Sequence, residues 1–229
     1  MPLVVQRTRL DVMERGLCLF GGGEHAAVVA ETASLAGWRV AGCFTSKASE
    51  ASEGLTRLGD DDDLIANPAR WRGHAFHLAF LGPPGSRRRR DLLQRLAGIG
   101  LTWATIVHPQ AVIAPSASLG VGVFVGPQAM IHTAAEVAAH ATINSAAVIE
   151  HHVRVGVGTH VAPAVVLGGG VHLGDWSFIG LGARVRDHLT IGTGAVIGMG
   201  AVVVSDVPAD ALVVGNPARP ITRRRETPL

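Results

Sequence analysis

Residues 143–173 read INSAAVIEHHVRVGVGTHVAPAVVLGGGVHL, and every sixth residue from Ile143 onward is Ile, Val or Leu. The same step of six runs without a break from Ile113 to Val203, and all sixteen of these anchor positions are aliphatic. The residue four places after each anchor is never charged. Glycine often follows the anchor directly, as at Gly120 and Gly156. A short, fixed period of this kind indicates a repeat architecture.

The six-residue period fits neither a helix nor a flat strand, whose side-chain periods are about 3.6 and 2. It predicts a parallel β-helix with triangular coils, in which each hexad forms one strand and one corner and three hexads close a coil of about 18 residues. The anchors then stack in the core at a strand spacing of about 4.8 Å, and glycine permits the tight corners. The alternative, a Val-rich β-sandwich, would need turns that never break the register.

Composition excludes several classes of protein. The 229 residues carry 20 Lys+Arg against 18 Asp+Glu, a balance that disfavours a nucleic-acid-binding protein. Cys18 and Cys43 form neither a disulfide framework nor a paired zinc motif. No apolar run approaches the ~20 residues of a membrane span, and residues 1–15 lack the apolar core of a signal peptide. We therefore expect a soluble, cytoplasmic protein without membrane or nucleic-acid partners.

The first part of the chain follows a different pattern. Apolar runs at 16–20, 38–44, 74–81 and 101–107 alternate with helical stretches at 26–36, 60–68 and 87–97. This alternation predicts a small parallel α/β sheet. We expect a Rossmann-like domain over residues 16–108, a linker at His108-Pro109, and the β-helix domain over residues 109–221.

The glycine turn after the first apolar run is a candidate ligand-binding loop. Gly21, Gly23 and Ala26 match the pattern G-x-G-x-x-A, which brings backbone N–H groups to a phosphate. A dinucleotide site also places an acidic residue after the second strand, where this chain has Thr45-Ser46-Lys47. An oxidoreductase is therefore disfavoured, whereas a sugar nucleotide or another phosphate-bearing ligand remains open.

Two charge runs precede helices in this first part. Arg87–Arg90 resembles an anion site and Asp60–Asp63 resembles a metal site. Charge runs at helix starts are usually solvated, and acidic residues favour a helix N-terminus. We expect both runs to be solvent-exposed.

Histidines gather in the repeats. None of the seven occupies an anchor or the place four beyond it, so we expect all of them outside the coil core: His132, His140, His151, His152, His160, His172 and His188.

His151 is the histidine best placed for chemistry. It belongs to the polar run Glu150-His151-His152 and lies one coil from Gly169, within the side-chain-free run 168–170. An imidazole takes a proton from an amine or hydroxyl near neutral pH, and a free N–H above it holds a thioester carbonyl as charge develops. This layout predicts acyl transfer.

A zinc site built from histidines at a subunit interface is the competing chemistry, and it would need three converging imidazoles. His152 and His188 lie two coils apart on one edge, roughly 10 Å by strand spacing, which is too far for one ion. We therefore expect no metal, and we expect His132, His140, His172 and His188 to be solvated surface residues.

The chain resembles the bacterial sugar acyltransferases that include sialic-acid O-acetyltransferases and nucleotide-amino-sugar N-acetyltransferases. The resemblance covers about residues 16–221. It is carried by the loop Gly21–Ala26, Val107-His108-Pro109, the hexapeptide array, Val148–His151 and Val213–Arg219. It implies a left-handed parallel β-helix behind the Rossmann-like domain, acetyl-CoA as donor, a sugar as acceptor, and a homotrimer with active sites between neighbouring β-helices.

The resemblance also implies roles for single residues. His151 is the general base, with Glu150 as its orienting carboxylate if the corner bends that side chain back. His160 lies beside the acetyl group or the pantetheine arm, and Gly169, next to Gly168, supplies a backbone N–H to the thioester carbonyl. His25 and the loop Gly21-Gly22-Gly23 face the acceptor sugar.

Two positions depart from the family pattern. His152 stands where many relatives carry an acid, and we expect it to be a solvated neighbour whose removal barely changes activity. Thr45-Ser46-Lys47 stands where relatives that act on nucleotide sugars often carry Asp.

The sequence therefore predicts an acetyl-CoA-dependent transfer to an amino or hydroxyl group of a sugar, with a nucleotide-linked amino sugar as the expected acceptor. The rivals are a sialic-acid-type O-acetyltransferase, a non-catalytic β-helix assembly protein with a ligand-binding front domain, and a metal-dependent hydratase.

Overall fold

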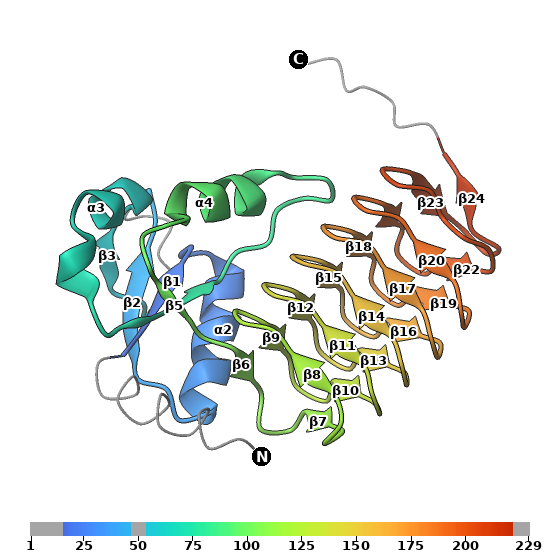
Figure 1. Ribbon diagram of the computed structural model, residues 1–229, viewed down its shortest axis with the longest axis horizontal. Helices are drawn as coiled ribbons and strands as arrows, with labels where there is room; N and C mark the ends of the chain where they lie inside the picture. The colour runs from blue at the N-terminus through green and yellow to red at the C-terminus, as the bar shows by residue number, and fades with distance from the viewer. Residues whose placement is uncertain (1–15, 47–53, 222–229) are drawn as a thin grey trace. The chain divides into compact units, whose positions relative to one another are not determined.

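The structure is a computed structural model that describes residues 16–46 and 54–221 (Figure 1). Two compact units divide the chain. The first comprises the residues up to Pro109 together with Val121–Phe124, and the second comprises Gln110–Gly120 and the residues from Val125 onward. Lys47 and residues 1–15, which entered the sequence analysis, lie outside the described residues.

The first unit contains a five-stranded parallel sheet with the order β3-β2-β1-β4-β5. Its strands are β1 (Leu17–Phe20), β2 (Val40–Phe44), β3 (Arg57–Gly59), β4 (Ala75–Leu78) and β5 (Thr102–Trp103). The expected Rossmann-like α/β sheet is confirmed. All residues of β1 and β4 are buried, as expected for central strands of a parallel sheet with both faces covered.

The helices of this unit are α2 (Glu24–Leu35), α3 (Asp61–Ala66), the 3₁₀ helix η2 (Pro68–Trp71) and α4 (Arg88–Leu96). A capping box begins α3: the Asp60 and Asp63 carboxylates each accept the other's backbone N–H at 3.0 Å. The Ser86 hydroxyl accepts the backbone N–H of Arg88 at the start of α4. The expected helices are confirmed, with ends shifted by one or two residues.

The side chains of β1 alternate between two apolar clusters, as a strand requires. Leu17 and Leu19 pack in one cluster with the α2 residues Ala26 and Val29. Cys18 and Phe20 pack on the opposite face of the sheet with residues of α3 and α4, namely Leu64, Leu92 and Leu96. The helices thus cover both faces of the sheet.

The structure corrects the sequence prediction in two places. Strand β3 was not predicted, because it has three residues and little apolar periodicity. Residues 101–107 were predicted as one strand, but they form two strands in two different sheets. Here β5 pairs with β4, whereas β6 (Ile106–Val107) belongs to a sheet of the β-helix. The Ile106 N–H donates to the Val123 carbonyl at 2.8 Å, so the chain changes sheets between Trp103 and Ile106.

The second unit is built from three stacks of short strands, one for each side of a triangular coil, and the expected left-handed parallel β-helix is confirmed. The eight-stranded sheet contains β6, β9 (Phe124–Val125), β12 (Thr142–Ile143), β15 (His160–Val161), β18 (Phe178–Ile179), β21 (Val196–Ile197), β23 (Leu212–Val214) and β24 (Arg219–Pro220). The six-stranded sheet contains β7 (Val112–Ile113), β10 (Met130–Ile131), β13 (Val148–Ile149), β16 (Val166–Leu167), β19 (Arg184–Val185) and β22 (Val202–Val203). The five-stranded sheet contains β8 (Ser118–Leu119), β11 (Glu136–Val137), β14 (Arg154–Val155), β17 (His172–Leu173) and β20 (Thr190–Ile191).

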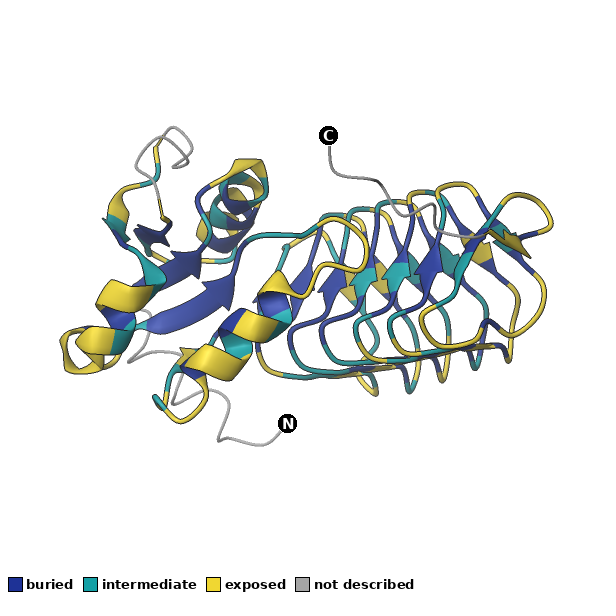
Figure 2. Ribbon diagram, turned by 90° about the horizontal axis from the view of Figure 1, so that it is seen from above, coloured by how far each residue is buried: buried dark blue, intermediate teal, exposed yellow. Residues whose placement is uncertain are grey.

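The strand register confirms the coil length. Ile131 pairs with Ile149 and Ile149 pairs with Leu167, always in parallel, so each coil takes 18 residues. These anchors are at most 1% exposed, and Figure 2 shows buried, dark blue positions that recur from coil to coil along the stack. The hexad phase read from the sequence therefore places these anchors in the core of the coil.

The corners follow a rule that the sequence analysis did not contain. At fourteen of the sixteen anchors, all except the first and the last, the residue three places further on adopts the left-handed backbone conformation, whether or not it is glycine. The non-glycine examples, with φ between 54° and 59°, are Gln128, Ala134, His140, Ala146, His152, Ala164, Trp176 and His188. A non-glycine residue is uncommon in this region, so the stack imposes the conformation corner after corner.

No helix in the described part of the chain has the length and apolar character that a bilayer crossing requires.

Candidate active site

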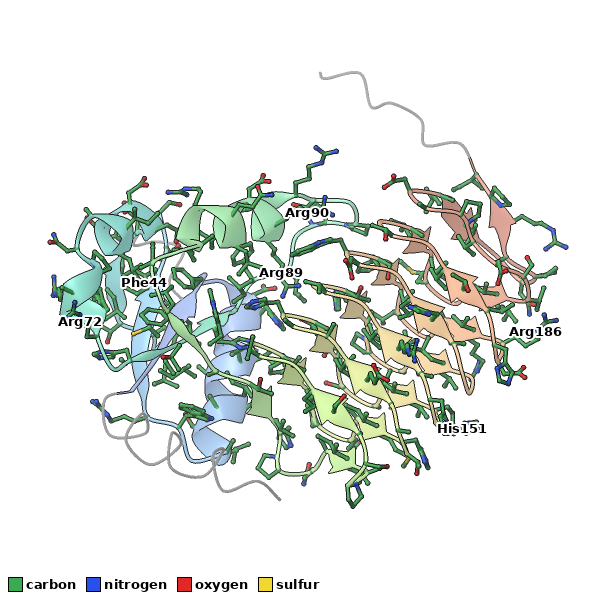
Figure 3. All side chains as sticks on the ribbon, viewed as in Figure 1. Phe44, Arg72, Arg89, Arg90, His151 and Arg186 are labelled. Carbon is green, nitrogen blue, oxygen red and sulfur yellow. The ribbon has the colours of Figure 1, made fainter. Side chains whose placement is uncertain are left out.

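His151 lies at the corner after β13, where the chain turns from the six-stranded to the five-stranded sheet. Its anchor Ile149 is fully buried, whereas the His151 side chain is exposed. Figure 3 shows His151 at the corner edge of the coils, along which Arg186 also lies. The core packing of the coil therefore does not depend on this imidazole.

The His151 ring rests on the backbone of Gly169. A Cβ built on Gly169 would lie 2.5 Å from Cε1 and 2.6 Å from Nε2 of His151, too close for any side chain. Among the described residues, no group accepts a hydrogen bond from the Gly169 N–H, while its carbonyl accepts the His188 N–H at 2.9 Å. The structure thus brings together an exposed imidazole and a bare backbone amide, as the sequence predicted.

The neighbouring glycines have packing reasons of their own. A Cβ on Gly168 would lie 2.5 Å from the backbone nitrogen of Asp187, one coil further along. Gly170 is left-handed, with φ 69°, and a Cβ there would lie 2.5 Å from Nδ1 of His188. The close approach of successive coils thus accounts for Gly168, which we had predicted to contact the cofactor.

Glu150 and His152 contact His151 in different ways. The Glu150 carboxylate accepts the backbone N–H of His151 at 3.3 Å. The ring nitrogen Nδ1 of His151 lies 3.2 Å from Nδ1 of His152, and the two ring planes are 81° apart. His152 is solvent-exposed, as expected, but its ring also lies within hydrogen-bonding distance of the His151 ring.

His160 lies on another side of the coil. It is the first residue of β15 in the eight-stranded sheet, points outward and is partly buried. Its ring contacts Phe178, one coil further along, edge to face with the ring centres 5.1 Å apart. A single chain therefore carries His151 on a corner edge and His160 on a sheet that does not adjoin this corner.

His140 contradicts the expectation that it is a solvated surface residue outside the coil core. His140 is only 8% exposed, although it occupies neither an anchor nor the place four beyond one. It is a left-handed corner residue with φ 57°. This backbone conformation turns a side chain along the stack, as seen for Trp176, whose ring lies over Gly158. The position of a residue within its hexad does not by itself predict this side-chain direction.

The glycine loop Gly21-Gly22-Gly23 connects β1 to α2 in the first unit. Gly21 has φ 100°, and its N–H donates to the Phe44 carbonyl at 2.9 Å. Gly22 is buried and Gly23 is exposed. A Cβ on Gly23 would meet nothing within 4 Å, so the protein itself does not require glycine there.

His25 follows this loop in the first turn of α2. Its ring lies edge to face against Phe124, with the ring centres 5.6 Å apart. Burial, helped by the charge of Arg89, lowers the pKa of His25 to about 4. His25 is therefore neutral at pH 7 and presents an uncharged imidazole.

A pocket of about 490 Å³ opens at the carboxyl ends of β1, β2 and β4. This is the edge at which open parallel sheets bind their ligands. Thr45 and Ser46 line the pocket at the end of β2, where the family pattern places an acid. The full lining consists of Gly21, Phe44, Thr45, Ser46, Asp60, Asp61, Asp62, Phe80, Arg87, Arg88, Asp91, Leu92 and Arg95.

The two charge runs are less solvated than the sequence suggested. Arg87 and Arg88 line the pocket, and Arg89 is only 7% exposed, on the inward face of α4 that also carries Leu92 (Figure 3). Burial lowers the pKa of Arg89 to about 10. The expectation of a solvated arginine run is wrong at Arg89, because helical periodicity turns this member of the run toward the core.

The acidic run also contributes to the pocket. Asp60 caps α3 as expected, while Asp61 and Asp62 line the pocket wall. Burial raises the pKa of Asp61, against the lowering effect of Arg95 and Arg88. Asp61 was not predicted as a candidate ligand-binding residue. In the sequence, Asp61 stands out only as part of the acidic run Asp60–Asp63, and the start of a helix already accounts for that run.

Across residues 16–46 and 54–221, no three side chains of His, Cys, Asp or Glu converge in a way that fits a metal ion.

No protein-family model and no curated protein matches this chain, but several solved structures do. PerB from Caulobacter crescentus, solved with CoA and GDP-perosamine, shares 35% identity over 90% of this chain and 97% of its own length, with a TM-score of 0.82. The acetyltransferase domain of PglB from Neisseria gonorrhoeae shares 30% identity over 90% of this chain and 100% of its own length, also with a TM-score of 0.82. That domain was also solved with acetyl coenzyme A.

These structures cover both units of the chain, and their identities of 30–35% extend over nearly their whole length. The expected enzyme class is thereby confirmed. The chain belongs to the bacterial sugar acyltransferases of the hexapeptide-repeat type.

Proposed function

We propose that this protein transfers the acetyl group of acetyl-CoA to the amino group of a nucleotide-linked sugar, with His151 as the general base. The observation that carries the proposal is the exposed His151 imidazole resting on the bare backbone of Gly169. The relatives support the donor and the acceptor class, because one was solved with CoA and GDP-perosamine and another with acetyl coenzyme A.

In the proposed reaction the sugar nitrogen attacks the thioester carbonyl carbon. Nε2 of His151 takes the proton that the nitrogen loses. The carbonyl oxygen gains negative charge, which the Gly169 N–H stabilises by donating a hydrogen bond. The carbon–sulfur bond then breaks, and the departing sulfur takes the proton from His151. The products are an acetamido sugar and CoA thiol, and the base ends in its starting state.

The nucleotide part of the acceptor is assigned to the pocket of the first unit. Beyond Gly21, whose own N–H donates to the Phe44 carbonyl, the loop and the start of α2 supply backbone N–H groups for phosphate. Thr45, Ser46 and Asp61 in the pocket wall offer hydroxyl and carboxylate groups to a ribose or a base. The neutral His25 beside the loop adds no charge of its own.

The active protein is proposed to be a homotrimer. His151 and His160 lie on different sides of one coil, so a site that uses both takes them from two copies of the chain. The outer column of the six-stranded sheet is apolar at Val112, Met130, Val148, Val166 and Val202 and is interrupted by Arg184 between the last two. A closed ring of three chains would bury such a face and repeat the shared site three times.

A panel of acceptors tests the proposed function. Purified protein is mixed with acetyl-CoA and with nucleotide-linked 4-amino sugars, their free-sugar counterparts, or the matching hydroxyl sugars. The release of CoA thiol is followed, and the product is identified by mass spectrometry. We expect turnover with at least one nucleotide-linked amino sugar and much weaker turnover with its free counterpart. Turnover of hydroxyl sugars alone would make the protein an O-acetyltransferase, and no thiol release from any acceptor would contradict acetyl transfer.

A further inference from the structure

We propose that His152 is a positioning residue for His151, which fixes the imidazole tautomer that the reaction needs. This inference rests on the proposed function, in which His151 is the base. The Nδ1 atoms of the two rings face each other at 3.2 Å, and the ring centres are 5.4 Å apart. This contact is within hydrogen-bonding range of a nitrogen donor and a nitrogen acceptor.

The facing nitrogens allow two arrangements, since a neutral imidazole carries one N–H. If His151 donates from Nδ1, its Nε2 holds a lone pair. If His152 donates instead, Nε2 of His151 carries the hydrogen and cannot accept a proton. Nε2 is the nitrogen that lies against Gly169, where the thioester carbonyl would be held. The reaction therefore requires His152 to accept from His151.

The other side chains near this corner do not serve that purpose. The Glu150 carboxylate is bonded to the backbone N–H of His151 and not to its ring. Asp187, on the coil beyond Gly169, faces His188 at 4.0 Å. Among the described residues, His152 is the hydrogen-bonding partner of the His151 ring.

The corner itself tolerates a change at His152. Its φ of 59° is matched by the φ of 55° at Ala134, which holds the same corner position one coil earlier. Asp210 also adopts φ 57°, so the chain accommodates an acid in this conformation. In Asn or Asp, Oδ1 stands at the same number of bonds from the backbone as Nδ1 of histidine. Substitutions to Ala, Asn and Asp thus remove, keep or charge the acceptor without disturbing the coil.

Steady-state kinetics of these three variants test the proposal. His152→Ala is expected to lower kcat by about 10- to 100-fold, with the KM for acetyl-CoA changed less than about threefold, in line with the loss of a group that orients a catalytic imidazole. His152→Asn should restore kcat to within about threefold of wild type. His188→Ala is the matched control, because it removes an imidazole from the same corner position with φ 56° and should leave kcat unchanged. Unchanged kcat in His152→Ala, or an equal loss in His152→Asn, would overturn the proposal.

The pH dependence of kcat/KM in His152→Asp distinguishes a positioning role of residue 152 from a purely structural one. A carboxylate beside His151 favours its protonated form, so the acidic limb of the kcat/KM profile should move to higher pH in His152→Asp. The other charged or titratable groups around the corner are unchanged in this variant: Glu150 on the same corner, His132 one coil earlier, and Arg186, Asp187 and His188 beyond the glycine run. An acidic limb that stays in place would count against the inference.

Two further measurements separate this inference from the proposed function. If His152 acts only through His151, the double variant His151→Ala/His152→Ala should be no slower than His151→Ala alone. Nitrogen-15 NMR of labelled histidine reads the tautomer without any turnover. It should show His151 with its hydrogen on Nδ1 in the wild type, and a shift toward the Nε2–H form in His152→Ala. A wild type that fails to acetylate amino sugars would refute the proposed function, whereas an unchanged tautomer in His152→Ala would refute the role of His152.

Discussion

His151 of the β-helix and His25 of the α/β unit are both candidate functional residues, but they lie in opposite environments. In the β-helix, His151 is exposed at a corner while the anchors that hold the coil are fully buried. In the α/β unit, Arg89 is 7% exposed and His25 is buried enough to lower its pKa to about 4. In the β-helix, a candidate catalytic side chain can therefore be removed without loss of core packing. In the α/β unit, the buried candidate side chains are themselves part of the packed core. Variants at each place test whether this difference holds.

The largest effect is expected at His151. His151→Ala should lower kcat by about 10²–10⁴-fold, because it removes the group that accepts the proton during attack. The midpoint of urea unfolding should stay at the wild-type value, since the side chain is exposed and packs on no apolar core. A lower urea midpoint would show that the His151 side chain also contributes to stability. A variant that remains fully active would show that His151 is not the base.

The core of the coil should show the reverse pattern. Leu173→Ala is expected to lower the free energy of unfolding by about 2–5 kcal/mol, because Leu173 is 1% exposed and its loss leaves a cavity. His172→Ala, at the exposed neighbour on the same strand, should change it by less than about 0.5 kcal/mol. Urea titrations of both variants check the prediction. Similar losses at the two positions would show that the hexad phase does not govern packing.

These two predictions use what the hexads reveal from sequence alone. The register of the coil, the buried anchors and the contact of His151 with Gly169 all follow from counting residues, because every coil repeats the same backbone path. The burial of His140 and the contact between His151 and His152 do not follow. They depend on the left-handed corner residue, which directs its side chain along the stack.

The α/β unit was less readable from sequence. The order of helices and strands was predictable from apolar runs, but the place of charged side chains was not. Arg87–Arg90 read as a solvated run, yet Arg89 turns inward and Arg88 lines the pocket. Strand β3 brings no apolar run of its own, and residues 101–107 divide between two sheets. The burial of Arg89, the formation of β3 and the division of residues 101–107 depend on tertiary packing, which local sequence patterns do not predict.

Lowering the pH should show how the buried His25 contributes to the stability of the protein. Its pKa is about 4 in the folded protein against an ordinary value of 6.5, so the unfolded chain binds a proton first as the pH falls. The contribution of neutral His25 to the free energy of unfolding is complete above about pH 6.5. It is lost progressively down to about pH 4, by roughly 3 kcal/mol at most. Unfolding measured between pH 7 and pH 4 should show a shallower loss in His25→Gln. Equal slopes in the two proteins would contradict the buried, neutral histidine.

The smallest effect is expected at Gly23. Its Cβ position is empty, so Gly23→Ala should fold normally and raise only the KM for the acceptor, by about tenfold or ~1.4 kcal/mol of binding. The KM for acetyl-CoA should be unchanged. Ser34→Ala, at an exposed position of the same helix, is the control. If both KM values rise together, the loop does not act through the acceptor.

The central claim is that acetyl transfer takes His151 from one chain and His160 from another. The most direct measurement unfolds and refolds His151→Ala and His160→Ala proteins together and follows CoA thiol release at an acetyl-CoA concentration below the wild-type KM. We expect weak activity in each variant alone and, in an equal mixture, recovery toward about a quarter of the wild-type rate, because about a quarter of randomly formed interfaces join two intact histidines. A mixture no more active than the average of its two components would contradict the shared site.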